Sequence, residues 1–295
     1  MENQYHRIDF RDQISRNKRK SVFLMIGIFF VIVLLGYVIS MAFAPGYFFI
    51  IMIFAIIFSM IYILTSFYNS DKIAIASVGA KKASREQYKQ YHDSVEGLTI
   101  ASGLPMPELY IMKSSQINAF ASGRDPEHAV ICVTEGALEK LERRELEGVL
   151  AHELGHIANY DIRYITIVAV MVGMVAIISQ IFLRSLWFKG RGNDKSKAIF
   201  ILIGIALAIL APIVVYFVQM SISRKREFSS DASAVMFTRY PGGLIGALKK
   251  IKEDNSPPEK KINKAVAPLF ISNPFRNIGR THPPLDERIK VLERM

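Results

Sequence analysis

The sequence predicts a mostly helical integral membrane protein with a small β-sheet. No charged residue occurs from Ser21 to Ser70, and two further uncharged runs, 164–183 and 198–223, follow later in the chain. A hydrophobic content of 51% accompanies a net charge of +11, which is typical of membrane spans with basic flanks. The basic residues do not alternate with aromatic ones on a predicted sheet, so nucleic acid is not expected as a partner.

The first uncharged run is long enough for two spans. It breaks at Ala44-Pro45-Gly46, and each half, 21–43 and 47–68, reaches the roughly 20 residues that a hydrocarbon core requires. We therefore expect a basic N-terminal tail over 1–20 and a transmembrane hairpin over 21–70. The later runs predict a second hydrophobic hairpin over 164–223, which gives about four spans in total.

The polar parts of the chain, 71–163 and 224–295, are expected to form one domain together. Apolar spacing predicts a helix from Ser84 to Ala101. Turn residues then separate three candidate strands, which are 108–112, 117–121 and 129–133. Thr134 is a suitable N-cap for the helix that follows. The single cysteine, Cys132, lies in an apolar strand-like run and indicates a buried side chain.

The stretch from His152 to His156 reads H-E-x-x-H. On a helix, the two histidines project from one face and can bind one metal ion, while Glu153 lies close enough to contact a metal-bound water. Zinc binds imidazole and carboxylate ligands and keeps one position open for water, so the pattern indicates metal-assisted hydrolysis with Glu153 as the base. The alternative is an amphipathic helix with two histidines on a polar face.

A third protein ligand is needed for a zinc site. The third histidine of the H-E-x-x-H-x-x-G-x-x-H group is excluded, because Ile162 stands at its position. Glu227 is the best candidate, and Asp231, one helical turn later, could hydrogen-bond a zinc-binding histidine. A charged helix end that pairs with Arg224 or Lys225 would also explain these residues, and the segment taken alone favours that explanation.

Four motifs in order carry a family resemblance: Asn118–Gly123, His152–Asn159, Ser223–Asp231 and Thr281–Ile289. Together they resemble the HtpX family of bacterial membrane zinc metalloproteases, which is related to the type I CAAX prenyl proteases. The resemblance extends from the first span to the C-terminus. It departs from the usual pattern at Ser230, where the family generally has alanine.

The resemblance implies a zincin-like metalloprotease domain with one Zn²⁺ per chain. It assigns the metal to His152, His156 and Glu227, and the role of catalytic base to Glu153. His282, in the C-terminal His-Pro-Pro motif, is a candidate oxyanion donor. A rigid cap on the last helix explains His282 equally well.

Asn118, Ala119 and Phe120 are candidate substrate-binding residues. They lie in an alternating segment just before the catalytic helix, and we expect an edge strand there that pairs with an extended substrate backbone. For the side chains, an ordinary strand with Phe120 in the core is as good an explanation.

The expected function is a membrane-embedded zinc endopeptidase with protein or peptide substrates. It would hydrolyse membrane or misfolded proteins at the cytoplasmic face of the bacterial membrane, in protein quality control and stress response. Basic flanks such as Lys18, Lys81 and Lys225 favour this orientation, whereas five positive residues in 184–197 would then face outward. The alternatives are a CAAX-type or intramembrane zinc protease, or a non-catalytic zinc-binding membrane adaptor.

Overall fold

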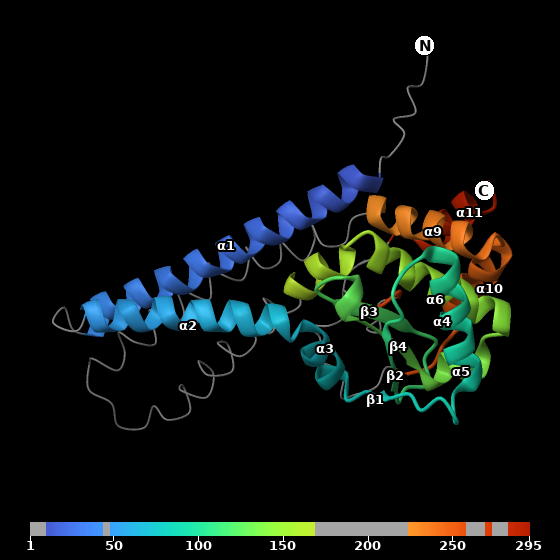
Figure 1. Cartoon of the computed structure of the whole chain (residues 1–295), viewed down its shortest axis with the longest axis horizontal. Coiled ribbons are helices and arrows are strands. Elements are labelled where there is room, and N and C mark those ends of the chain that lie inside the picture. The colour runs from blue at the N-terminus through green and yellow to red at the C-terminus, as the bar shows by residue number, and fades with distance from the viewer. Residues whose placement is uncertain (1–9, 44–47, 169–223, 258–268, 273–282) are drawn as a thin grey trace, which may run out of the picture.

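The computed structural model describes residues 10–43, 48–168, 224–257, 269–272 and 283–295. Two long helices, α1 (Phe10–Phe43) and α2 (Phe48–Tyr68), pack side by side and extend away from a rounded domain that holds the sheet and the other helices (Figure 1). Because α1 begins at Phe10, the second half of the expected basic tail is helical. The first candidate hairpin therefore starts from a helix that also contacts the domain.

The helix α2 is long and apolar enough to cross a membrane, and no other helix in the described ranges meets both criteria. Large apolar side chains are exposed along α2, as expected for a surface that faces lipid; they include Phe49, Ile50, Ile53 and Phe54. The four expected spans are thus not confirmed. Most of the second expected hairpin, 169–223, lies outside the described residues.

The sheet is small and mixed. Its order is β1-β2-β4-β3, with β1 (Lys81–Lys82), β2 (Glu108–Met112), β4 (Ala129–Thr134) and β3 (Ala119–Gly123). Only β2 and β4 run parallel. The expected strands are all present, although β3 begins two residues later than the alternation suggested. The two-residue β1 is too short to leave an alternating pattern in the sequence.

Alternate residues of the strands enter two different cores. Ile131, Val133 and Ala121 face the main cluster with α4 (Lys89–Ser102) and α6 (Arg143–Ala158). Val130 and Cys132 face a second cluster that also contains Ala74 and Ile75 of α3 (Ser70–Val78). This period of two explains why β4 is buried along its whole length. The predicted burial of Cys132 is confirmed.

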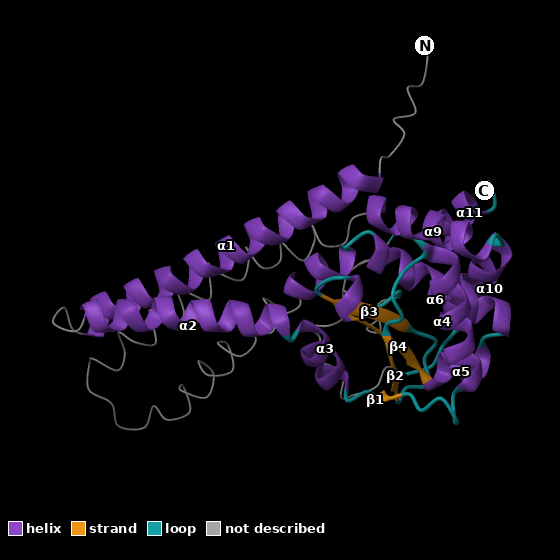
Figure 2. Ribbon diagram, in the orientation of Figure 1, coloured by secondary structure: helices purple, strands orange, loops and turns teal. Residues whose placement is uncertain are grey.

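The helix α6 lies in the middle of the helical layer (Figure 2). The other α-helices in the described part of the domain are α5 (Glu135–Lys140), α9 (Arg224–Thr238), α10 (Pro241–Glu253) and α11 (Leu285–Leu292). As predicted, the Thr134 side chain caps α5 by accepting a hydrogen bond from the backbone N–H of Ala137. The helix α4 ends at Ser102, one residue after the expected Ala101, and Gly103 follows it with φ of 70°; it begins at Lys89 rather than at Ser84.

Close approach of α6 to its neighbours depends on glycine. A Cβ atom on Gly148 would lie 2.5 Å from the backbone nitrogen of Leu244 in α10. A Cβ atom on Gly155 would lie 2.6 Å from the Ser230 hydroxyl and 3.1 Å from the Ser230 Cα atom in α9. Side chains at these positions would push the helices apart. The sequence thus places α9 directly against the H-E-x-x-H turn.

Candidate metal centre

His152 and His156 meet inside the domain. Both belong to α6, on which every residue from Gly148 to Ile157 is buried. Their separation of four residues brings the two imidazoles to one face, and their Nε2 atoms lie 3.2 Å apart. The alternative of two histidines on an exposed polar face is therefore wrong.

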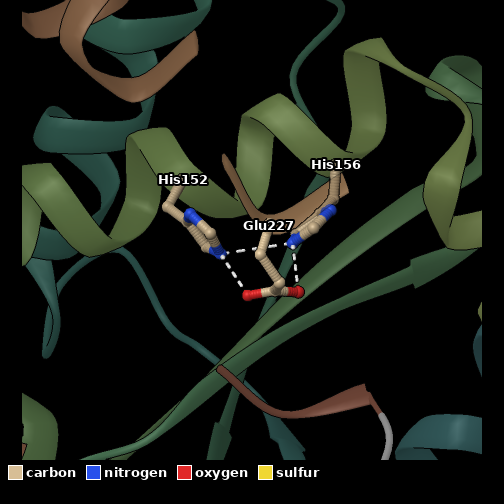
Figure 3. Close-up of side chains that lie close together, drawn as sticks. All are labelled: His152, His156 and Glu227. Atoms are coloured by element: carbon tan, nitrogen blue, oxygen red, sulfur yellow. Dashed lines mark hydrogen bonds and ion pairs between the residues drawn. The ribbon is translucent and has the colours of Figure 1, made fainter. Parts of the chain in front are cut away.

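Glu227 joins the two histidines from the first turn of α9 (Figure 3). Its Oε2 atom lies 3.8 Å from Nε2 of His152, and its Oε1 atom lies 3.6 Å from Nε2 of His156. The carboxylate is buried and faces the histidines. The three residues form a group that could hold a metal ion, with ligand atoms all within 4.8 Å of one another.

The spacing of these atoms fits zinc. Two atoms that each bind a tetrahedral zinc ion at about 2.0–2.1 Å lie about 3.3–3.4 Å from each other. The observed separations of 3.2, 3.6 and 3.8 Å are close to that value. Two imidazoles and one carboxylate are also a ligand set that zinc accepts in catalytic sites, where a fourth position is left for water.

Each imidazole is oriented by a carboxylate on its other nitrogen. Asp231 Oδ1 lies 2.9 Å from Nδ1 of His152, as the sequence suggested, and Asp161 Oδ2 lies 3.1 Å from Nδ1 of His156. A carboxylate at Nδ1 keeps the proton on that nitrogen and leaves Nε2 free to bind metal. Sequence reasoning missed Asp161, whose only signal is that it is the first carboxylate after the H-E-x-x-H helix.

Arg288 supplies positive charge behind the ligands. This fully buried residue of α11 donates hydrogen bonds from Nε and Nη2 to the two oxygens of Asp231, at 2.9 and 2.6 Å. Its Nη1 atom lies 3.3 Å from Oε2 of Glu227. Burial and the charge of Arg288 lower the pKa of His152 to about 4. Arg288 lies within the quoted C-terminal motif, but nothing in the local pattern connects it with Glu227.

The pKa of His156 is shifted in the opposite direction from that of His152. Burial opposes its protonation, but the hydrogen bond to Asp161 and the charge of Glu227 outweigh burial and raise the pKa of His156 to about 9. The two Nε2 atoms lie too close together for both to carry a proton. With the proton of each neutral ring on Nδ1, both Nε2 lone pairs can bind one metal ion.

Glu153 follows His152 on α6 and is only 2% exposed. Burial raises the pKa of its carboxyl group to about 7; the charge of Glu227 adds to this, while His156 and a backbone hydrogen bond from Ala121 in β3 oppose it. A group with a pKa near neutrality can both accept and return a proton at physiological pH. The role of Glu153 as the base stays a prediction.

Ala119 and Phe120 lie at the start of β3, the last strand of the described sheet, and Asn118 directly precedes it. On the side away from β4, Phe120 forms an isolated antiparallel bridge with Phe270. Ile271 donates a backbone hydrogen bond of 2.9 Å to the carbonyl of Ala119, and the side-chain Nδ2 of Asn118 donates a hydrogen bond of 2.8 Å to the backbone carbonyl of Ser272. Phe120 is buried against Phe270. Residues 269–272 thus contact this edge, and the Phe120 side chain packs in the core. His282 lies outside the described residues.

Residues 85–295 match Peptidase family M48. The chain belongs to peptidase family M48. It is 41% identical over 294 residues to a protease HtpX homolog of Dictyoglomus turgidum, a match that covers 97% of this chain and 95% of the relative. It is 44% identical over 244 residues to a protease HtpX homolog of Thermoanaerobacter pseudethanolicus, covering 79% of this chain and 81% of the relative.

Membership of family M48 confirms the expected resemblance and the expected enzyme class, a zinc metalloendopeptidase. The crystal structure of S. mikatae Ste24p aligns with 95% of this chain and 66% of that chain, at 20% identity and a TM-score of 0.49. A likeness of that size supports no conclusion about function. The zinc-binding class rests on the family and on the convergence of His152, His156 and Glu227.

Proposed function

We propose that this M48 peptidase binds one Zn²⁺ through His152, His156 and Glu227 and uses Glu153 as its general base. The observation that carries the proposal is the buried convergence of three ligand atoms, with a carboxylate fixing each imidazole from behind. When bound, zinc would polarise the scissile carbonyl and acidify a water molecule. A structural zinc site would be closed by a fourth protein ligand, whereas the described residues supply three ligands at this site.

The residues divide the work of hydrolysis. Glu153 takes a proton from the attacking water as the new C–O bond forms, and it returns that proton to the amine as the C–N bond breaks. Asp231 and Asp161 keep the imidazoles aimed at one point during both steps. Arg288 balances the charge of Glu227 and Asp231. We also assign His282 as an oxyanion donor, on the family resemblance alone.

Substrate binding is proposed at the edge of β3. This strand lies next to α6, begins with Ala119 and Phe120, and directly follows Asn118. An extended peptide can add a strand to such an edge. Because Ile271 already bonds the Ala119 carbonyl and Phe120 bridges to Phe270, a substrate strand must either displace residues 269–272 or pair with β3 beyond Phe120.

The substrates are proposed to be membrane proteins or misfolded proteins, cleaved at the cytoplasmic face of the membrane. The peptidase itself would be a multi-pass membrane protein with a role in membrane protein quality control. The apolar arm of α1 and α2 supports a membrane location. Basic residues at the domain end of this arm, among them Lys18, Lys72 and Lys225, support a cytoplasmic domain, because positive flanks stay in the cytoplasm.

The central test is the Glu153→Gln variant of the full chain, purified in detergent and reloaded with zinc. The substitution keeps the shape of the side chain but removes the base, so we expect one zinc per chain and about 10²- to 10⁴-fold slower proteolysis of an unfolded protein substrate. Glu147→Gln is the matched control, because Glu147 lies on the same helix and pairs with Arg143 at the surface. Near-normal turnover by Glu153→Gln would remove Glu153 from the mechanism.

A second test concerns the ligand set. Glu227→Ala should lose most of its zinc affinity, because two imidazoles and water form a poor site, while Glu253→Ala at the exposed end of α10 should bind zinc normally. Metal content and competition with a chromophoric chelator measure both. Stoichiometric zinc at unchanged affinity in Glu227→Ala would mean that the third ligand is another residue.

A further inference from the structure

The carboxylate behind His156 is itself held by the N-terminal helix. Asn17 of α1 donates a hydrogen bond of 2.7 Å from Nδ2 to Oδ1 of Asp161. The other oxygen of the same carboxylate faces Nδ1 of His156 at 3.1 Å. Asn17 is 3% exposed and Asp161 is fully buried, so water does not compete for this contact. A continuous chain of hydrogen bonds thus runs from α1 to a proposed zinc ligand.

Both amide hydrogens of Asn17 are used. The same Nδ2 atom also donates a 3.0 Å hydrogen bond to the backbone carbonyl of Asn159, at the end of α6. Because both partners are acceptors, the amide orientation is determined: nitrogen must face the turn and oxygen must face away. Asn17 therefore ties Asn159, the C-cap residue of the H-E-x-x-H helix, to the carboxylate that orients His156.

Other residues of α1 also contact this turn and the residues that follow it. The ammonium group of Lys18 lies 4.1 Å from the ring centroid of Tyr160, between Asn159 and Asp161 in the sequence. Tyr160 has φ of 57°, an uncommon value for a residue with a side chain, so the turn needs support from its neighbours. Further along α1, Leu24 and Ile28 pack with Tyr164 and Ile167.

Arg226 and Lys20 are charged groups near Asp161. The Nε atom of Arg226 lies 3.8 Å from Oδ1 and adds positive charge beside the carboxylate. The direct hydrogen bond from Asn17 to Oδ1 holds the plane of this carboxylate. Since a carboxylate at Nδ1 sets the direction of Nε2, a rotation of Asp161 would turn the His156 lone pair away from the metal.

We propose that Asn17 is a positioning residue of the metal centre, through which the membrane-proximal end of α1 and zinc binding at His156 are coupled. The inference rests on the proposed ligand set and adds to it a residue outside the catalytic motifs. Coupling of this kind is reciprocal. A disturbed α1 should weaken zinc binding, and bound zinc should stabilise the contact of α1 with the domain.

The first experiment measures zinc affinity of the full chain in detergent. Asn17→Asp keeps the size of the side chain but places a second carboxylate against Asp161, and Asn17→Ala removes the donor. Both should weaken zinc binding by about 10- to 100-fold, the usual effect of losing a group that orients a ligand. Asp161→Asn should show a similar loss, and adding Asn17→Ala to Asp161→Asn should cost little more, because the two act through one contact.

Ser21→Ala is the matched control. Ser21 lies one turn along α1 and is buried, but its hydroxyl donates only to the Asn17 backbone carbonyl. It should therefore leave zinc affinity unchanged. The absorption spectrum of the cobalt-loaded protein gives a second readout, since Asn17→Ala should alter the ligand-field bands and Ser21→Ala should not. Equal effects of Ser21→Ala and Asn17→Ala would indicate general loosening of α1 and overturn the proposal.

The second experiment needs no variant. Hydrogen exchange of the native chain, with and without zinc, should show stronger protection of backbone amides around residues 14–24 when zinc is present. Unchanged exchange there, or unchanged zinc affinity in both Asn17 variants, would refute the coupling. The ligand set is judged separately by Glu227→Ala: if that variant loses zinc while the Asn17 variants keep it, only the role of Asn17 is wrong.

Discussion

Arg288 shows how much of the metal centre depends on one residue far from the H-E-x-x-H motif. It reaches the site from α11, makes two hydrogen bonds to Asp231 and lies 3.3 Å from Glu227, all out of contact with water. A buried carboxylate is costly unless it is paired and hydrogen-bonded. Arg288 therefore compensates the charge of two buried carboxylates that both contact His152: Asp231 at Nδ1 and Glu227 near Nε2.

Replacement of Arg288 should for this reason be among the more damaging changes in the domain. Arg288→Gln leaves Asp231 without its countercharge and should lower the free energy of unfolding by about 3–5 kcal/mol, with weaker zinc binding. Arg288→Lys keeps the charge but not the two-pronged hydrogen bond and should lie in between. Thermal unfolding measures both.

The matched control is Arg143→Gln, which breaks an exposed ion pair with Glu147 on α6 and should change stability by less than about 1 kcal/mol. If Arg288→Gln were as mild as Arg143→Gln, the network around Asp231 would not contribute to stability as its burial implies.

His282 remains a prediction at the level of single residues. As an oxyanion donor it would act only in the transition state, so His282→Ala should lower kcat with little change in zinc content, melting temperature or KM. As part of a rigid cap on α11 it should instead lower the melting temperature and leave the turnover of the folded fraction intact. Zinc content, melting temperature and steady-state kinetics on one preparation separate the two roles.

At the level of elements, the centre exists because α6 and α9 approach closely. The Ser230 hydroxyl donates a hydrogen bond to the His152 backbone carbonyl at the point where Gly155 has no side chain. This hydrogen bond is a contact that the alanine usually found at this position in the family could not make. It also sets the distance from which Glu227 reaches the two histidines.

Gly155→Ala tests that close approach. The new methyl group would lie 3.1 Å from the Ser230 Cα atom, so α9 should move outward, and we expect lower stability and weaker zinc binding. Gly97→Ala is the control, because Gly97 also lies inside a helix but has open space around its Cα atom. That variant should be neutral or more stable by about 0.5–1 kcal/mol. Equal zinc affinity in the two variants would show that α9 need not lie so close.

Local patterns were enough to predict the strands, the cap at Thr134 and the pair of His152 and His156. Each of these depends on residues within one element or one turn of it, whereas Glu227 and Asp231 needed the family motif in addition. Asp161, Arg288 and Asn17 could not be predicted in the same way. Asn17 and Arg288 make contacts with residues more than a hundred positions away, and such contacts leave no periodic signal in one sequence. Asp161 lies only five residues after His156, but it follows the end of α6, where helical spacing no longer places a side chain.

At the level of the whole molecule, α1 has two roles that its composition does not separate. Its apolar portion packs along α2 in the arm, and its polar first turns pack on the turn after the H-E-x-x-H helix (Figure 1). The proposed membrane segment and the metal centre are therefore joined without a flexible linker. Such an arrangement would hold the active site at a fixed height above the bilayer.

The orientation of the molecule can be tested with cysteine labelling, because Cys132 gives little background. Cys132 is buried, and burial raises the pKa of its thiol well above the usual value, so it should react slowly with maleimides. Lys81→Cys places a thiol on the exposed β1 at the domain, and Phe49→Cys places one at the far end of the arm.

If the domain is cytoplasmic, a membrane-impermeant maleimide should modify Lys81→Cys in inverted membrane vesicles but not in intact spheroplasts, and Phe49→Cys should show the reverse. The expectation follows from the basic flanks at the domain end, which favour the cytoplasm, against the basic segment 184–197, which would then face outward. Modification of Lys81→Cys in intact spheroplasts would place the active site outside the cytoplasm. The substrates would then have to be sought among exported proteins.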